Sequence, residues 1–444
     1  MVPRLILKLR SSIWFIPGLY AVLASLLALG MVLVDTTFNT QVKGFIPEYL
    51  RTSVDLAQTI LGTISGALLT MTTITFSTIM VVLTMYSSQF SPRTLQNFLN
   101  APSTQRVLGM FMGGFIYSIL SLLFMRKQSI THEVVSATVA VLLAVVCLAF
   151  FAYFIHKVGR AVQVSRLIRN LADDVLETID ETMRAVEEEA VVTLPEKPPL
   201  AAAYSSVTEF RNGTYGYIQS IQIRELADWA AEQEAVIDIL TPIGTFVGTE
   251  SMIAAVYHDS RLPDFEPARK FTVGEERSTL QDVEYGIEKI AEIGLRALSP
   301  GINDPNTAVR CIHTLGEVLE RATHLPGGFR VRYAEGNKPC LILPQASLAD
   351  HLYAAFSQMS FYGRQDAAVL HAMLDALLYI ARSRRSSHET LNEVRRIGEY
   401  VWNRFDHTGL EPLDSERLAD KQQSLRALTA DGPHTSLSDG HPIG

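Results

Sequence analysis

The sequence predicts a membrane all-α domain of four transmembrane helices followed by a soluble α+β domain. Hydrophobic residues make up 48% of the 444-residue chain and charged residues 19%, below the roughly 25% usual for soluble domains. The mean hydropathy is +0.17, and the apolar excess is concentrated before residue 157. Strand-like and helix-like patterns alternate in the remainder. These observations indicate a membrane-embedded N-terminal part with a soluble remainder.

Four segments are apolar enough to span a membrane, which takes about 20 residues in a helix. They are Ile13–Val34, Leu56–Ser88, Val107–Met125 and Val134–Ile155. The second is too long for one span, so we expect one of its ends to project beyond the hydrocarbon. The first has basic flanking residues, as a signal peptide has, but its apolar part is too long and no small-residue cleavage site follows. We therefore expect an uncleaved helix.

Lysine and arginine near the span ends predict the orientation, because the side richer in them stays in the cytoplasm. The predicted cytoplasmic set is Arg4, Lys8, Arg10, Arg93, Arg106, Lys157, Arg160, Arg166 and Arg169, and the outer set is Lys43, Arg51, Arg126 and Lys127. This bias places both termini in the cytoplasm. The three cysteines show no metal spacing and predict no disulfide framework, as expected for a cytoplasmic C-terminal domain.

The chain divides into four predicted parts. Residues 1–156 form the four-helix transmembrane domain, 157–194 a helical stalk and linker, 195–405 the cytoplasmic α+β domain, and 406–444 a disordered tail. We expect the stalk to continue straight from the fourth span, since no proline interrupts it. Its apolar stripe at near-heptad spacing predicts either packing on the soluble domain or self-association as a coiled coil. The tail contains few large apolar residues, which favours disorder.

Alternating patterns in the soluble domain predict strands, and helical periodicity predicts helices. The strands are expected at Thr214–Ile221, Ala235–Leu240, Thr245–Val247 and Ser251–Tyr257, with a hairpin over Phe329–Leu343. The helices are expected at Ile223–Gln233, Thr279–Leu298, Asn306–Ala322, Ser347–Ser360, Asp366–Ser383 and His388–Asn403. The strands near Tyr215–His258 suggest a small sheet or half-barrel.

The second predicted span carries a stripe of small and hydroxyl-bearing side chains along one helical face. At spacings of four and three, its positions are Thr59, Thr63, Gly66, Thr70, Thr73, Ser77, Met80, Thr84 and Ser87. Leu, Ile, Val, Met and Phe occupy the other faces, and no ionised side chain lies in Leu56–Ser88. One face of this helix is therefore suited to meet protein or water while the others meet lipid.

Two interpretations of this stripe remain open. Small and hydroxyl residues promote close helix packing in lipid. Gly62 and Gly66 form a G-x-x-x-G pattern in this span, as Gly109 and Gly113 do in the third. Alternatively, several copies of the chain point the stripe at a common axis and line a pore, with Met80 as an apolar constriction.

Acidic residues and histidines are absent from the interior of the predicted spans, and Asp35 and His156 sit only at ends. Proton-driven pumps and many ion-coupled carriers keep such groups at bilayer depth. The sequence thus argues against a proton-coupled transporter and leaves a passive channel or a structural protein.

The second span is followed by Ser91, Pro92 and Arg93, which we expect at the cytoplasmic face. Arg93 and Arg106 would form a basic rim there. Such a rim anchors to anionic lipid headgroups. The functional alternative is a cytoplasmic mouth that attracts anions or contacts the soluble domain.

The segment Ser299–Pro305 connects two predicted helices. Pro300 stops the first helix, while Asp304 suits the N-cap and Pro305 the first position of the second. The alternative is a ligand site, because a helix N-terminus offers free N–H groups to an anionic small molecule or a peptide segment. The residues expected to converge on that site are Arg277, Asp282, Arg296, Asn303, Asp304 and Arg310.

Two stretches, S-S-Q-F-S-P-R over Ser87–Arg93 and R-A-L-S-P-G-I-N-D-P over Arg296–Pro305, resemble a bacterial family of predicted inner-membrane proteins with a domain of unknown function. The resemblance extends from the first span to about Phe405. It implies four spans in the bacterial inner (plasma) membrane and a cytoplasmic C-terminal domain. It implies no activity.

Enzyme motifs are missing, including the Walker A loop, G-x-S-x-G, H-E-x-x-H and C-x-x-C. We therefore predict no enzyme, cofactor or metal, and the net charge of −8 does not suggest nucleic-acid binding. Two functions remain open: a passive ion channel or transport protein with a cytoplasmic regulatory domain, or a membrane-anchored sensor or scaffold. The expected partners are the lipid bilayer, further copies of the chain, and a small ligand or ion.

Overall fold

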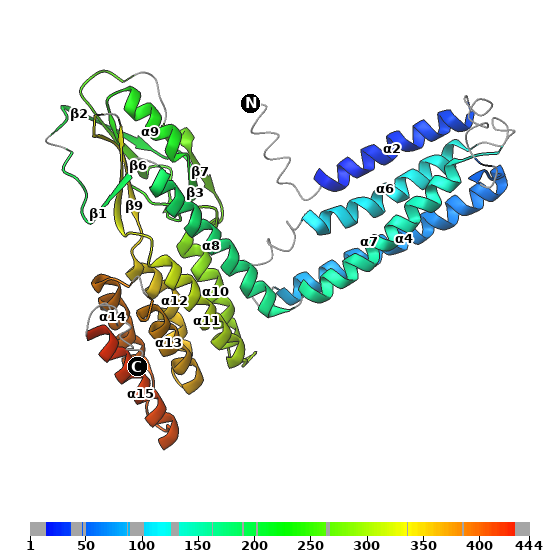
Figure 1. Cartoon of the computed structure of the whole chain (residues 1–444). Helices are drawn as coiled ribbons and strands as arrows, with labels where there is room; N and C mark the ends of the chain where they lie inside the picture. Colours follow the sequence, from blue (N-terminus) through cyan, green and yellow to red (C-terminus); the bar gives the residue numbers. More distant parts are fainter. Residues whose placement is uncertain are drawn as a thin grey trace, which may run out of the picture. The chain divides into compact units, whose positions relative to one another are not determined.

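The computed structural model of the chain describes residues 15–36, 47, 50–86, 88, 102–125, 133–161, 163–188, 191–200, 203–262, 267–334, 336–383 and 386–430. The chain forms two compact units, Met1–Val164 and Ser165–Gly444. Figure 1 shows the helices of the first unit and the mixed strands and helices of the second. This combination confirms the predicted fold class.

The N-terminal unit is built from four long helices. Their bounds are α2 Phe15–Thr36, α4 Val54–Met85, α6 Pro102–Phe124 and α7 Ser136–Ala161. Among the described residues, these four helices are long and apolar enough to cross a membrane. Each overlaps one of the predicted spans. The 32 residues of α4 give a length of about 48 Å, well above the roughly 30 Å of a bilayer's hydrocarbon core.

Helix α6 packs against the other three helices of the unit. Its glycines allow this close approach. A Cβ atom at Gly109 would lie 3.2 Å from the Pro17 Cα atom, and one at Gly113 would lie 3.2 Å from the Tyr20 carbonyl oxygen. The small-residue pattern of the third span therefore serves packing between α6 and α2, as small residues do in membrane helices.

Polar groups tie α2, α6 and the residues before α4 to the start of α7. The Asp35 carboxylate accepts hydrogen bonds from the backbone N–H groups of Val135 and Ser136, at 2.9 and 3.3 Å. The Tyr117 hydroxyl donates to the Ser136 carbonyl oxygen at 2.9 Å, and Thr52 forms a β-bridge with Val134. Asp35 thus occupies free donors at a helix N-terminus, which gives this acid a structural role.

The predicted stalk is not continuous with the fourth span, because α7 ends at Ala161 and a separate helix, α8, begins at Val164 and ends at Glu188. Its apolar stripe is buried in the C-terminal unit; the fully covered members are Leu167, Ile168, Leu171, Ala172, Val175 and Ile179. A Cβ atom at Gly286 would overlap the Val175 side chain, so only glycine permits this approach of α8 to α10. Of the two predictions for the stalk, packing on the soluble domain is the one that the structure shows.

In the described part of the C-terminal unit, nine strands form two sheets around a shared core. The six-stranded sheet has the order β1-β8-β9-β4-β6-β2, parallel only between β4 and β9, and the antiparallel three-stranded sheet has the order β5-β3-β7. The bounds are β1 Val191–Leu194, β2 Ser206–Arg211, β3 Gly216–Ile221, β4 Val236–Ile239, β5 Phe246–Val247, β6 Met252–His258, β7 Phe271–Gly274, β8 Gly328–Ala334 and β9 Lys338–Gln345. Helix α9, Ile223–Glu232, contributes to the same core. The predicted half-barrel thus corresponds to two sheets, and β1, β2 and β7 are additional strands.

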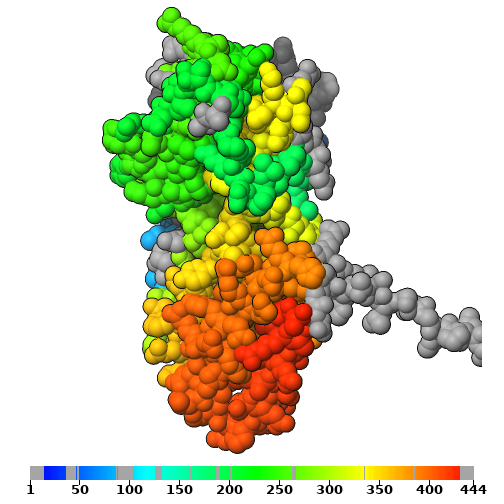
Figure 2. All heavy atoms as spheres, turned by 90° about the vertical axis from the view of Figure 1, so that its left-hand side faces the viewer, coloured from blue at the N-terminus to red at the C-terminus, as the bar shows by residue number. Residues whose placement is uncertain are grey.

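The remaining helices form the other half of this unit (Figure 2). Their bounds are α10 Val283–Ala297, α11 Pro305–Ala322, α12 Leu348–Tyr362, α13 Ala367–Ala381, α14 His388–Arg404 and α15 Pro412–Ala430. The disordered tail predicted from residue 406 is wrong for α15. Leu418, Gln422, Leu425 and Thr429 are buried along one face of that helix, which packs on α13 and α14. These four residues are enough to pack α15 on its neighbours, although the helix as a whole is polar.

The proline-rich segment between β1 and β2 is anchored to the sheet. Lys197 forms an ion pair with Asp238 of the central strand β4, whose side chain is 1% exposed. Burial raises the pKa of the Asp238 carboxyl, and the Lys197 ammonium partly offsets this effect. Leu200 packs nearby on Val236, Val331 and Ile342. This proline-rich segment is therefore part of the folded unit.

Substitution of Gly109 should test the packing of α6 on α2. Gly109→Val is expected to destabilise the N-terminal unit by about 1–3 kcal/mol, because the new side chain meets the backbone at Pro17. Gly30→Val is the matched control, since nothing lies within 4 Å of a Cβ atom there. Thermal unfolding of the full chain in detergent provides the measurement. Equal stability of the two variants would contradict the assigned packing.

Candidate functional site

The polar stripe of α4 lies on the surface of the single chain. Every described member of the stripe, from Thr59 to Thr84, is exposed. The buried residues of α4 lie on other faces: Ala57, Leu61, Ser65, Leu68, Thr75, Ile79 and Val82. Ser87 lies outside the described residues. Among the described residues of its own unit, the stripe is therefore not used for packing, which leaves the packing interpretation open for contacts between chains.

The stripe's threonine hydroxyls donate hydrogen bonds to the helix that carries them. The donors are Thr59, Thr63, Thr70, Thr73 and Thr84, each bonded to the carbonyl oxygen four residues earlier at 2.8–3.0 Å. Such back-bonding uses the hydroxyl hydrogen but leaves acceptor lone pairs on the oxygen. The exposed face of α4 thus offers hydrogen-bond acceptors at several successive turns.

The G-x-x-x-G pattern of α4 is open, unlike that of α6. Nothing lies within 4 Å of a Cβ atom built at Gly62 or at Gly66. Met80, farther along the same stripe, is 60% exposed. The exposed face of α4 thus has small residues at Gly62 and Gly66 and the bulky, flexible Met80 side chain nearer its C-terminal end.

The predicted cytoplasmic mouth, Ser91, Pro92 and Arg93, lies outside the described residues. Arg106, expected in the same basic rim, is exposed in the first turns of α6. The role of this rim therefore stays a prediction.

The segment Ser299–Pro305 is a helix connector, as one interpretation of its sequence predicted. Asp304 is the N-cap of α11, with its carboxylate accepting from the Thr307 N–H at 3.2 Å and the Thr307 hydroxyl at 2.6 Å. Pro305 is the first helical residue. Asn303 has a positive φ of 51°, a conformation that asparagine tolerates better than most residues. These contacts account for the Asn-Asp-Pro sequence.

The six residues of the predicted ligand site do not converge. Asp282 is the N-cap of α10, whereas Asp304 lies beyond its C-terminal end. The 15 residues of α10 separate the two ends by about 22 Å. Arg277 lies with Asp282, and Arg296, Asn303 and Arg310 belong to the opposite end. The prediction of one site is wrong, because the helix expected over Thr279–Leu298 itself holds Arg277 and Asp282 apart from the residues that follow it.

Arg277 and Asp282 instead form a partly buried structural pair. The guanidinium of Arg277 donates to both oxygens of Asp282, at 2.8 and 2.9 Å, and to Glu288 at 3.0 Å. Asp282 also accepts the Tyr285 N–H at 2.9 Å. The turn at Gly244, with a φ of 84°, packs directly on this pair, so that a Cβ atom there would overlap it. The pair therefore joins the sheet region to the start of α10.

The buried Lys289 of α10 and His351 of α12, and the neighbouring Asp174 of α8, had no counterpart in the predictions. Burial raises the pKa of the Asp174 carboxyl on α8 and lowers the pKa of the Lys289 ammonium on α10. These two groups attract each other electrostatically. Burial also lowers the pKa of His351 on α12. The sequence did contain one sign of this arrangement. Lys289 falls on the apolar face of its predicted helix, which indicates a buried lysine.

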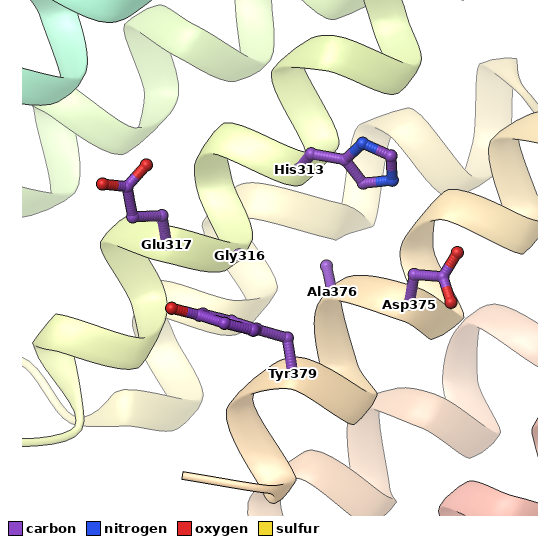
Figure 3. Close-up of a pocket in the computed structure, with 6 residues that line it drawn as sticks. All are labelled: His313, Gly316, Glu317, Asp375, Ala376 and Tyr379. Atoms are coloured by element: carbon purple, nitrogen blue, oxygen red, sulfur yellow. The ribbon is translucent and has the colours of Figure 1, made fainter.

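A cavity of about 420 Å³ lies between α11 and α13. Figure 3 shows His313 and Asp375 on one side of the Gly316–Ala376 contact, and Glu317 with Tyr379 on the other. Glu317 forms an ion pair with Arg169 of α8 at 2.8 Å. Asp375 pairs with Lys421 of α15. No cluster of three potential metal ligands occurs in the described part of the chain.

Removal of the Arg277 guanidinium should destabilise the C-terminal unit. Arg277→Gln is expected to lower the free energy of unfolding by about 3–5 kcal/mol, because breaking a buried pair leaves the Asp282 charge without its partner. Arg211→Gln is the control, because its pair with Glu250 is exposed and contributes at most about 1 kcal/mol. Thermal unfolding of the full chain measures both. Similar losses for the two variants would show that the Arg277 pair is not structural.

Comparisons with known proteins agree with this architecture. Three relatives are uncharacterised proteins of Mycobacterium tuberculosis (strains CDC 1551 / Oshkosh and ATCC 25618 / H37Rv) and Mycobacterium bovis, each 28% identical over 345 residues. The matched region covers 74% of this chain and 64% of the length of each relative. No solved structure shows a significant match. The model of the family described as "Predicted membrane protein (DUF2254)" matches residues 10–379, and the chain belongs to this family.

Proposed function

We propose that several copies of the chain assemble through α4 in the bacterial inner membrane and form a passive path for cations. In this arrangement the C-terminal unit lies in the cytoplasm and regulates the path. The observation that carries the proposal is the position of the stripe. All its described members are exposed, so no described residue of the N-terminal unit covers them, and the proposal has another copy of the chain do so.

The open face of α4 suits association with an identical face. Without a hydrophobic drive between helices in lipid, close backbone approach provides much of the attraction. Gly62 and Gly66 leave room for such an approach, whereas the equivalent glycines of α6 are already covered by α2. Copies that meet near these glycines would turn Thr70, Thr73 and Ser77 towards a common axis.

The hydroxyl chemistry favours cations as the conducted species. Because the threonine hydrogens are bonded to carbonyl oxygens of the same helix, the oxygens present lone pairs to the axis. Rings of such oxygens can replace part of a cation's hydration shell. No ionised side chain lies between Leu56 and Met85, which favours passive conduction over proton coupling.

Helix α8 is suited to link the C-terminal unit to the path. It begins at Val164, shortly after α7 ends at Ala161. Two ion pairs fix it to α11, Arg169 with Glu317 at 2.8 Å and Asp180 with Arg321 at 2.7 Å. A movement of the C-terminal unit would therefore pull on α7. The excess of lysine and arginine at the span ends places both termini in the cytoplasm in this proposal.

Potassium flux into liposomes that contain the full chain tests the proposal. The variant Thr70→Val/Thr73→Val/Ser77→Ala removes three hydroxyls with little change in volume and should reduce flux about tenfold or more, since each lost polar contact costs about 1 kcal/mol. Thr72→Val/Thr78→Val is the matched control, because its hydroxyls are also back-bonded but lie off the stripe. Unchanged flux in the stripe variant, or no flux above empty liposomes in the wild type, would refute the proposal.

A second candidate function is a membrane-anchored sensor, favoured by the cavity between α11 and α13. Glu317 lines this cavity and also holds α8 through Arg169. A small molecule that binds Glu317 would compete with Arg169 and loosen α8 from α11. The same contact between Arg169 and Glu317 would allow a ligand to regulate a channel, so both functions would act through α8.

A metabolite screen by thermal shift on the full chain distinguishes this function. A ligand of the cavity should raise the unfolding temperature of the wild type. The increase should be much smaller for Tyr379→Ala, because this change removes an exposed side chain that lines the cavity. Tyr353→Ala is the control, as Tyr353 is equally exposed on α12 and is not part of the lining. Absence of any hit, or equal shifts in both variants, would count against a sensor built on this cavity.

A further inference from the structure

A cluster of arginine and aromatic side chains lies where α12 and α14 end. Phe361 is close to the end of α12, and Arg364 lies in the turn that follows. The guanidinium carbons of Arg364 and Arg404 lie 5.1 and 5.0 Å from the centre of the Phe361 ring. Two guanidinium cations therefore contact one phenyl ring, whose electron-rich faces attract cations.

The backbone around this cluster is closely packed. A Cβ atom at Gly363 would lie 2.9 Å from the Met359 carbonyl oxygen and 2.6 Å from a methyl group of Val369. The N–H of Asp406 donates to the Arg364 carbonyl oxygen at 2.8 Å, which joins the turn after α12 to the segment after α14. The two arginines are therefore presented by a fixed backbone rather than by a free surface loop.

The Arg404 side chain is also held by its own helix. Its guanidinium carbon lies 5.3 Å from the centre of the Tyr400 ring, and it donates a hydrogen bond to the Tyr400 hydroxyl. The Tyr400 ring in turn contacts Tyr353, with ring centres 6.0 Å apart. Ordered in this way, the guanidinium loses little freedom when it binds a further group.

Neither Arg364 nor Arg404 forms an ion pair with a carboxylate within the described part of the chain. The carboxylate that acts on Arg364 electrostatically is Asp406. Its oxygens accept hydrogen bonds from Thr408 and Gln365. Several N–H groups of the two guanidiniums thus remain available to an anion.

We propose that Arg364 and Arg404 bind a phosphate monoester. Such a group carries a charge of about −1.5 to −2 at neutral pH and three acceptor oxygens, which matches two guanidiniums better than a single carboxylate does. Guanidinium forks also suit the geometry of phosphate oxygens. Phe361 and Tyr362 are 40% and 64% exposed, and their rings meet edge to face at an interplanar angle of 87°, so they offer an aromatic corner to the organic part of the ligand. The site is independent of the proposed conduction path.

The phosphate can belong to a soluble molecule or to a lipid headgroup, and two probes separate these sources. Phenyl phosphate represents a soluble aromatic monoester, and dioctanoyl phosphatidic acid represents the lipid monoester. Binding of each to the full chain in detergent is measured by titration calorimetry. Dioctanoyl phosphatidylglycerol, a diester with a single charge, reports on non-specific lipid binding.

Arg364→Gln and Arg404→Gln should each weaken binding of the recognised monoester at least tenfold. Arg364→Lys should weaken it too, because it keeps the charge but loses the planar fork. The control is Arg396→Gln on α14, whose guanidinium is 72% exposed and pairs with Glu393. Thermal unfolding confirms that each variant remains folded. Specific binding of either monoester with this mutational pattern supports the site and identifies the source. No binding of either one, or equal binding by Arg364→Gln, Arg404→Gln and Arg396→Gln, overturns the proposal.

Discussion

The packing of α4 inside the N-terminal unit decides what its outer face can do. Leu61, Leu68 and Ile79 are covered by neighbouring helices, and this contact fixes the rotation of α4 about its axis. The hydroxyl stripe is consequently turned away from α6 and α7. In water an exposed polar face is ordinary, but inside a membrane a face that no described residue covers meets lipid or protein. The conduction proposal depends on this constraint more than on any single threonine.

The C-terminal unit depends in a similar way on α8. This helix supplies apolar residues to the unit that follows it and is bound by ion pairs to α11. Gly286 allows α8 to approach α10 at Val175, and the opposing charges of Asp174 and Lys289 lie across the same interface. A helix held by so many contacts behaves as part of the folded unit. In the proposed function, this attachment is what would let α8 transmit a change in that unit to α7.

Much of the architecture could be predicted from the sequence, because the patterns involved are local. The four spans, the hairpin β8–β9 and the Asp304 cap follow from apolar length, alternation and turn chemistry. Two features depended on contacts between distant residues and were not predictable. These were the docking of α15 and the break between α7 and α8. The separation of Arg277 from Asp304 was predictable, because the helix expected over Thr279–Leu298 lies between them. The stripe was predictable as a pattern, but its exposure depended on which face of α4 meets α6.

Disulfide cross-linking in native membranes tests the central claim, that α4 of one copy faces α4 of another, most directly. Thr70→Cys and Thr73→Cys should each give covalent dimers on mild oxidation. Val145→Cys, on the exposed side of α7, should not. Background from the native thiols is low, since Cys147, Cys311 and Cys340 are buried. Dimers from Val145→Cys but not from the two stripe variants would contradict the assembly through α4.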